Sequence, residues 1–217
     1  MAQVPSGTTF HIASTYASSQ DTTIVTNASE AVVTCAGHGY SNGDVVEVTS
    51  GWGGLHLRVF EVKSVTTDTF VLKGFDSSDT NKYAAGLGIG SVRKITAFTQ
   101  IQQVLDNQSS GGEPRPVNYK YTESDIEYSI NNGFAAVVYT LTLDDDSDTT
   151  AGYAALKTLT DSQADTCLKM LMKSGKRKFL PCTVALNEAT QLQEGQVNRV
   201  TCVFNGKNRM TSYKASE

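Results

Sequence analysis

The sequence has few cysteines and histidines, and none of them has the spacing of a metal site or a redox pair. The four cysteines form no C-x-x-C pair, and the three histidines supply no zinc-ligand spacing. These residues are Cys35, Cys167, Cys182 and Cys202, and His11, His38 and His56. Because 217 residues are enough to bury a core without disulfide bonds, we expect the cysteines to be small buried hydrophobic residues and expect no cofactor or metal.

Long apolar runs are also missing. No run approaches the roughly 20 residues that a membrane-spanning helix needs. The first ten residues, MAQVPSGTTF, lack the basic-then-apolar order of a secretory signal. The sequence therefore predicts a soluble protein that is made in the cytoplasm and has no membrane anchor.

An excess of basic residues is absent, since 18 Lys and Arg face 22 Asp and Glu for a formal charge of -4. Tight binding of nucleic acid needs a cationic surface that displaces counterions. The composition argues against such binding and is compatible with a surface along which DNA passes without being held.

Catalytic motifs are absent as well. There is no G-x-S-x-G sequence and no clustered acid, base and nucleophile, so we predict that the chain is not an enzyme. Gly86, Gly88 and Gly90 lack the following helix of a dinucleotide site and favour a hinge. The acidic run 144–148 lacks the Gly and distal Glu of a calcium loop and favours a solvated turn. His38 and His56 flank Trp52, where packing is more common than ligand binding.

What the chain has in abundance is Thr, Ser, Val and Gly, which favour strands and turns. A first strand is expected over Thr8–Tyr16, and Gly-rich turns separate four runs of period-two character. The runs are Ala31–Ala36, Asp44–Thr49, Arg58–Ser64 and Thr69–Lys73. We interpret residues 23–75 as a small inserted all-β module. Its segment His38–Asp44 resembles a turn-strand motif of small barrel modules in phage structural proteins and in one subdomain of ubiquitin-activating enzymes.

A long polar segment, residues 104–133, follows a strand expected over Ser91–Thr99. It contains two prolines and ends in Asn131-Asn132-Gly133, so we expect a loop. Loops of this length in a compact domain are usually functional or ordered by a partner. Candidate residues for contacts between subunits are Gln108, Gly111, Gly112, Glu113, Arg115, Tyr119 and Tyr121.

The C-terminal half predicts a defined order of elements. A strand over Phe134–Asp144 precedes a short helix that begins near Thr150, capped by Asp148 or Thr149, with Tyr153, Leu156 and Leu159 on one face. Further strands are expected over Ala164–Met172, Arg177–Leu186 and Val197–Phe204, with a hairpin turn at 174–176 and a short last strand after Asn205-Gly206.

This order resembles the tail tube protein of long-tailed, non-contractile bacteriophages. The segments that carry the resemblance are TAGYAALKTLT, CLKMLMKSGKRKFLPCTVAL and EGQVNRVTCVFNG. The resemblance implies a mainly β fold in which residues 1–22 and 76–217 form a β-sandwich core with one short helix. It also implies rings of six subunits that stack into a tube for DNA, assembled in the host cytoplasm with tape measure, tail-tip and tail-terminator proteins.

Two questions remain open at this point. The basic residues near the expected hairpin, Lys169, Lys173, Lys176, Arg177 and Lys178, are either a solvated face or a contact with an acidic patch on an adjacent subunit. The alternative to a tube subunit is another virion component, such as a head-to-tail connector or a decoration protein whose insert binds a host glycan.

Overall fold

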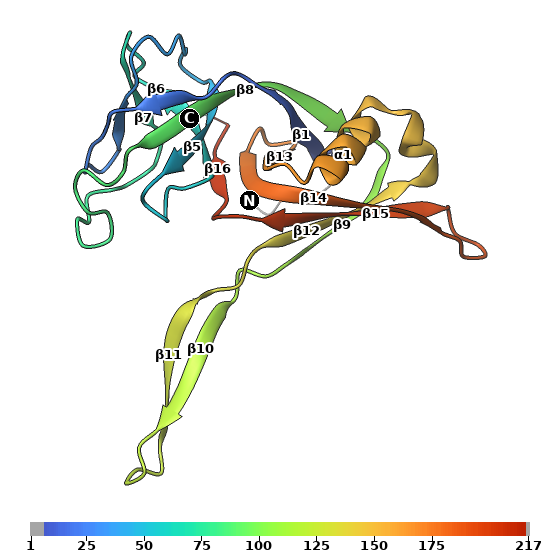
Figure 1. Cartoon of the computed structure of the whole chain (residues 1–217). Coiled ribbons are helices and arrows are strands. Elements are labelled where there is room, and N and C mark those ends of the chain that lie inside the picture. Colours follow the sequence, from blue (N-terminus) through green and yellow to red (C-terminus); the bar gives the residue numbers. More distant parts are fainter. Residues whose placement is uncertain (1–6, 216–217) are drawn as a thin grey trace.

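Sixteen strands, one α-helix and one 3-10 helix make up residues 7–215, the part of the chain that the computed structural model describes (Figure 1). Fourteen strands join in one antiparallel sheet, and the other two form a separate hairpin. The mainly β fold predicted from composition is confirmed. The first six residues of the expected core segment 1–22 lie outside the described residues.

The N-terminal part of the sheet encloses a small core of its own. Each of the four runs expected between 23 and 75 contains a strand. The strands here are β2 (Gln20–Thr22), β3 (Ile24–Val25), β4 (Val32–Thr34), β5 (Val45–Ser50), β6 (Arg58–Lys63) and β7 (Thr69–Leu72). Their buried side chains include Phe60 and Phe70, but the cluster extends to Tyr83 and Val92. The packing therefore continues beyond residue 75, and the boundaries of a separate domain stay a prediction.

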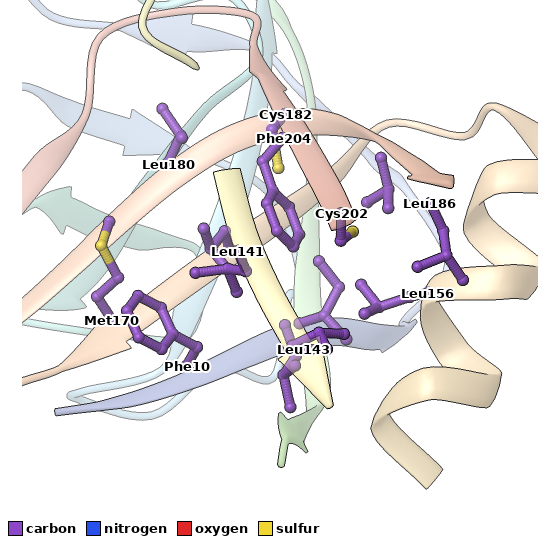
Figure 2. Close-up of a cluster of buried hydrophobic side chains, with 14 of the residues drawn as sticks. Phe10, Leu141, Leu143, Leu156, Met170, Leu180, Cys182, Leu186, Cys202 and Phe204 are labelled. Carbon is purple, nitrogen blue, oxygen red and sulfur yellow. The ribbon is translucent and has the colours of Figure 1, made fainter. Parts of the chain in front are cut away.

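The C-terminal part of the sheet curls around the larger core. Its strands are β1 (Thr9–Tyr16), β8 (Gly90–Ile101), β9 (Val104–Ser110), β12 (Val138–Asp144), β13 (Thr166–Leu171), β14 (Arg177–Gln191), β15 (Arg199–Gly206) and β16 (Thr211–Tyr213). Strands β13, β14 and β15 separate β1 from β12 in the sheet, yet Phe10 of β1 and Leu141 of β12 belong to the same buried cluster (Figure 2). One curled sheet thus supplies both layers around this core.

The single α-helix, α1 (Ala151–Ser162), closes one end of the larger core. Leu156 is fully buried there, and Tyr153 and Leu159 pack beside it, as the helical spacing predicts. The N-cap is Thr150, whose hydroxyl accepts a hydrogen bond from Tyr153 N at 3.3 Å. The cap expected at Asp148 or Thr149 is wrong by one or two residues, because those residues belong to the 3-10 helix η1 (Asp145–Thr149).

The loop expected over residues 104–133 is largely absent. Its first part is β9, which pairs with β12, and the rest forms a hairpin of β10 (Pro114–Lys120) and β11 (Glu127–Phe134). The strand expected from Phe134 begins only at Val138, since Phe134 ends β11. The polar composition is misleading here, because a solvent-exposed hairpin needs few apolar residues to form its backbone hydrogen bonds.

All four cysteines are free and buried, which confirms the interpretation from spacing. Burial raises the pKa of Cys182 to about 12 and that of Cys167 well above its ordinary value. Thiolates, which are the reactive form, are therefore scarce in the folded protein. We expect no reaction with Ellman's reagent at pH 8 in native buffer and four reactive thiols per chain in guanidinium chloride. A rapidly reacting thiol in the native protein would contradict this packing.

Candidate self-assembly surfaces

The hairpin β10–β11 extends away from the body of the molecule (Figure 1). Along one face, Val117 lies opposite Ile130 and Tyr119 lies opposite Tyr128. Along the other face, Asn118 pairs with Ser129 and Lys120 pairs with Glu127. Because side chains alternate between the faces of a strand, this two-stranded ribbon has one apolar and one polar side.

Three tyrosines form a cluster on the apolar face near the tip. The rings of Tyr119 and Tyr128 are stacked with centroids 5.4 Å apart, and the ring of Tyr121 contacts both, at 5.5 and 5.8 Å. Aromatic pairs of this geometry stabilise a hairpin beyond the area they bury. The tyrosine cluster thus holds the two strands together in the absence of a core.

Much of this apolar face is open to solvent in the single chain. Ile130 is 58 % exposed, and Ile126, at the tip, is 64 % exposed. Val117, Tyr121 and Tyr128 are exposed as well. A two-stranded hairpin in water is at best marginally stable, and one with an exposed apolar face favours association. The arrangement indicates a surface that another molecule covers.

The hairpin leaves the body through two glycines at its root. Gly111 and Gly112 have φ of +79° and +81°, a left-handed conformation that other residues adopt at a cost. A Cβ atom on Gly111 would also lie 1.9 Å from the carbonyl oxygen of Ala136. Glycine is therefore required at position 111, and it sets the direction in which the hairpin projects.

Strand β9 forms one border of the large sheet. It pairs with β12 on one side and ends the strand order on the other. Six of its seven residues, from Leu105 to Ser110, are exposed. A border strand of this kind offers unpaired backbone groups to the edge of a further strand.

Register shows which groups of β9 face outward. Gly206 N donates a hydrogen bond to Val137 O. The odd-numbered residues of β12 therefore point their backbone N–H and C=O groups toward β15, and the even-numbered residues point theirs toward β9. Asn107 lies opposite Leu141, and the Asn107 backbone N–H accordingly points to the open border, where it donates only to the neighbouring Asp106 carboxylate at 2.8 Å. Ser109, two residues on, has the same orientation. The open border thus presents backbone groups at both positions.

The candidate residues from sequence are divided between these two surfaces. Gln108 lies on β9 and Tyr119 in the tyrosine cluster, while the root region connects them. The root and hairpin contain the other candidates, Gly111, Gly112, Glu113, Arg115 and Tyr121. Sequence reasoning missed Val117, Tyr128 and Ile130, although their alternation with polar residues is visible in the sequence.

The basic residues do not form a single surface. Lys169 lies with its ammonium 4.9 Å from the centroid of the Phe98 ring, and burial lowers its pKa. Arg177 points to the small module, where its Nε lies 2.5 Å from Oε1 and its Nη2 3.0 Å from Oε2 of Glu61. Of the remaining lysines, Lys173 and Lys176 lie in the β13–β14 turn and Lys178 lies in β14. Their contact with a neighbouring subunit stays a prediction.

Glu61 is a junction between the small module and the curled core. Its side chain is 8 % exposed and also lies 3.5 Å from Lys73 Nζ, while Tyr213 donates through its hydroxyl to Lys73 O. Removing one partner of a buried ion pair leaves the other charge uncompensated. Glu61→Gln is expected to lower the free energy of unfolding by about 2 kcal/mol. This loss is smaller than that for a fully buried ion pair, because Arg177 is partly exposed and solvent screens its charge.

Urea denaturation followed by tryptophan fluorescence measures this effect. The matched control is Glu30→Gln, which breaks the exposed Glu30–Lys63 ion pair of 2.7 Å and is expected to change stability by less than about 1 kcal/mol. Equal effects of the two substitutions would show that the Glu61 junction contributes no more than a surface pair.

The other motifs from sequence have structural roles. His38 Nδ1 accepts from Tyr40 N at 3.0 Å, and His56 Nδ1 accepts from Ser50 N at 3.3 Å, so each ring serves its own turn. Gly88 of the expected glycine hinge packs on Trp52, whose indole N–H donates to Ala84 O at 2.8 Å. Across residues 7–215, no group of three or more His, Cys, Asp or Glu side chains is arranged to hold a metal ion.

Within the described range, the chain contains no helix of the length and apolar character that crossing a bilayer requires.

Comparison with known proteins identifies a family for this chain. The model of a family described as phage tail tube protein matches residues 50–215, about three quarters of the 217-residue chain. The match begins inside the small module and includes the hairpin, α1 and all the strands that follow. No curated protein matches the chain. The chain belongs to the phage tail tube protein family, and its role is that of a structural component of the phage tail.

Proposed function

We propose that this chain assembles into rings, each of six subunits, that stack into the tube through which phage DNA is delivered. The observation that carries the proposal is the exposed apolar face of the β10–β11 hairpin, which a single chain leaves uncovered. Exposed apolar surface of this kind is unfavourable in water and is stabilised when a second molecule covers it.

The open border of β9 supplies the second contact of the proposal. A neighbouring copy that pairs with Asn107 and Ser109 continues the sheet from one subunit to the next. Open pairing of strands continues without limit unless the rotation between copies closes the assembly. A closed ring provides this limit in one plane, and stacking of rings then builds a tube.

The charge of the chain supports passage of DNA. The formal charge is -4, and a tube wall without an excess of positive charge offers little opportunity for counterion release. DNA then moves along the tube without specific binding. In this proposal the protein has no catalytic function, and the tape measure, tail-tip and tail-terminator proteins set where growth starts and stops.

Electron microscopy of the purified protein tests the proposal. Raising the protein concentration, with and without purified tail-tip complex, is expected to produce rings and then tubes of constant diameter. Class averages of end-on views give the number of subunits in a ring. A protein that stays monomeric at every concentration and with the tail tip present would refute the proposed assembly.

A further inference from the structure

A groove lies at the root of the hairpin, between the end of β11 and the turn that joins β15 to β16. Its volume is about 560 Å³, which is within the usual range of ligand-binding pockets and corresponds to several side chains. Phe134, Ala136 and Val137 line one part of it, and Lys207, Arg209 and Met210 line the other. None of the residues that line the groove is acidic.

The groove has a positive end. The Arg209 guanidinium lies 5.0 Å from the centroid of the Phe134 ring, and Arg209 forms no ion pair within residues 7–215. Lys207 is paired with Asp165 at 3.3 Å, but its side chain is still 42 % exposed. An acidic and partly apolar occupant fits this chemistry.

The tip of the hairpin has this chemistry. Residues 120–127 contain one lysine and three acidic residues, for a net charge of 1 - 3 = -2. The acids are Glu123, Asp125 and Glu127, and Lys120 approaches Asp125 only at 3.9 Å on an exposed surface. Tyr121 and Ile126 provide exposed apolar side chains beside them. The tip therefore complements the groove in both charge and hydrophobicity.

A tip cannot reach the groove of its own chain. Each strand of the hairpin has seven or eight residues, so the tip lies roughly 23 Å or more from the root. Figure 1 shows the hairpin extending away from the body. The groove is lined by residues at the root of the hairpin, Gly112 and Phe134 among them. A hairpin tip that binds in this groove therefore comes from another copy of the chain.

We infer that the groove between β11 and the β15–β16 turn binds the hairpin tip of a second copy, with Arg209 and Lys207 facing Glu123 and Asp125. The inference rests on the proposed function and names the surface that receives the hairpin. Tip and groove are different surfaces, so the contact is heterologous: each copy gives one tip and accepts one tip, and the contact repeats through the assembly.

Charge reversal tests the inference. Arg209→Glu is expected to lower the mass of sedimentable tubes at a fixed protein concentration by about tenfold or more, because like charges then face each other. Asp125→Arg in the same chain is expected to restore at least part of this loss. Lys82→Glu changes the net charge by the same amount on an exposed turn outside the groove, and tubes are expected at the wild-type level. Unchanged assembly of Arg209→Glu would overturn the inference.

Disulfide trapping tests the contact directly. Ala136 is an exposed groove residue and Asp125 an exposed tip residue, and the four native cysteines are buried. Tubes of the double variant Ala136→Cys/Asp125→Cys are expected to give ladders of covalently joined chains under mild oxidation, whereas tubes of either single variant give none longer than dimers. The competing occupant is the exposed β14–β15 tip, tested with Ala136→Cys/Leu192→Cys.

The outcomes separate this inference from the proposed function. Ladders from the Asp125 pair support the contact, and ladders from the Leu192 pair alone overturn it in favour of the other tip. Tubes that form normally but give no ladder from either pair also overturn the contact, while the proposed tube stands. Failure of the wild-type protein to form rings or tubes under any condition refutes the proposed function itself.

Discussion

Serine at both Tyr119 and Tyr128 is expected to prevent tube formation while the body of the protein stays folded. The two rings stack at 5.4 Å on the apolar face of the hairpin and belong to no core cluster of the body. Truncating a buried aromatic side chain at an interface costs about 2 kcal/mol or more. Two such losses weaken association by about a thousandfold, since each 1.4 kcal/mol is a factor of ten.

Sedimentation and electron microscopy measure the loss, and thermal unfolding checks the fold. The matched control is Asn118→Ala with Ser129→Ala, a cross-strand pair on the opposite, polar face, for which tubes are expected. Replacing residues 114–134 with a two-residue turn should have the same effect as the serine pair. Tubes of normal yield from either hairpin variant would contradict the proposed role of the apolar face.

Proline at Asn107 is expected to block the second contact. The Asn107 N–H points to the open border of β9, so proline removes a donor that no strand of the same chain uses. In the assembly, the carbonyl oxygen of the neighbouring copy that would accept this hydrogen bond is left without a donor, which costs about 1–3 kcal/mol. Assembly is expected to weaken by about 5- to 150-fold, as measured by the critical concentration for tube formation.

Two controls define this result. Asn107→Ala keeps the N–H and is expected to assemble as the wild type does. Gln108→Pro removes an N–H that faces Thr140 of β12, and this variant is expected to lose stability of the monomer as well. An Asn107→Pro protein with an unchanged critical concentration would show that the border of β9 stays unpaired in the tube.

Much of the fold was predictable because period-two and helical patterns reflect burial. The runs at Asp44–Thr49 and Arg58–Ser64 became β5 and β6, whose inner side chains fill the small core. Helix α1 was predictable from the spacing of Tyr153, Leu156 and Leu159. In each case one face of the element is buried away from water and fixes the register. The positions of the apolar residues in the local sequence therefore predict the element.

The projecting hairpin could not be inferred in the same way. Prolines at 114 and 116, two glycines at the root and many polar residues favour a loop by composition. Its strands bury no face in the single chain. One side of the hairpin is polar, and the apolar side is exposed until another molecule covers it. The alternation of Val117 and Tyr119, matched by Tyr128 and Ile130, was the one signal available.

The junction at Glu61 illustrates a different limit. Glu61 and Arg177 are 116 positions apart, and only the curl of the sheet brings them together. The sequence of a basic cluster beside a turn does not show whether its side chains contact solvent, a neighbouring subunit or a residue of the same chain. Contacts of this range follow from tertiary packing and leave no local pattern.

Hydrogen–deuterium exchange in free and assembled protein is the most direct test of the central claim, that sister copies complete the surfaces one chain leaves open. The account predicts fast exchange in the monomer at the amides of Asn107 and Ser109 and in residues 114–134, and strong slowing at all of them in the assembled tube. Amides on these segments that exchange as fast in the tube as in the monomer would contradict it.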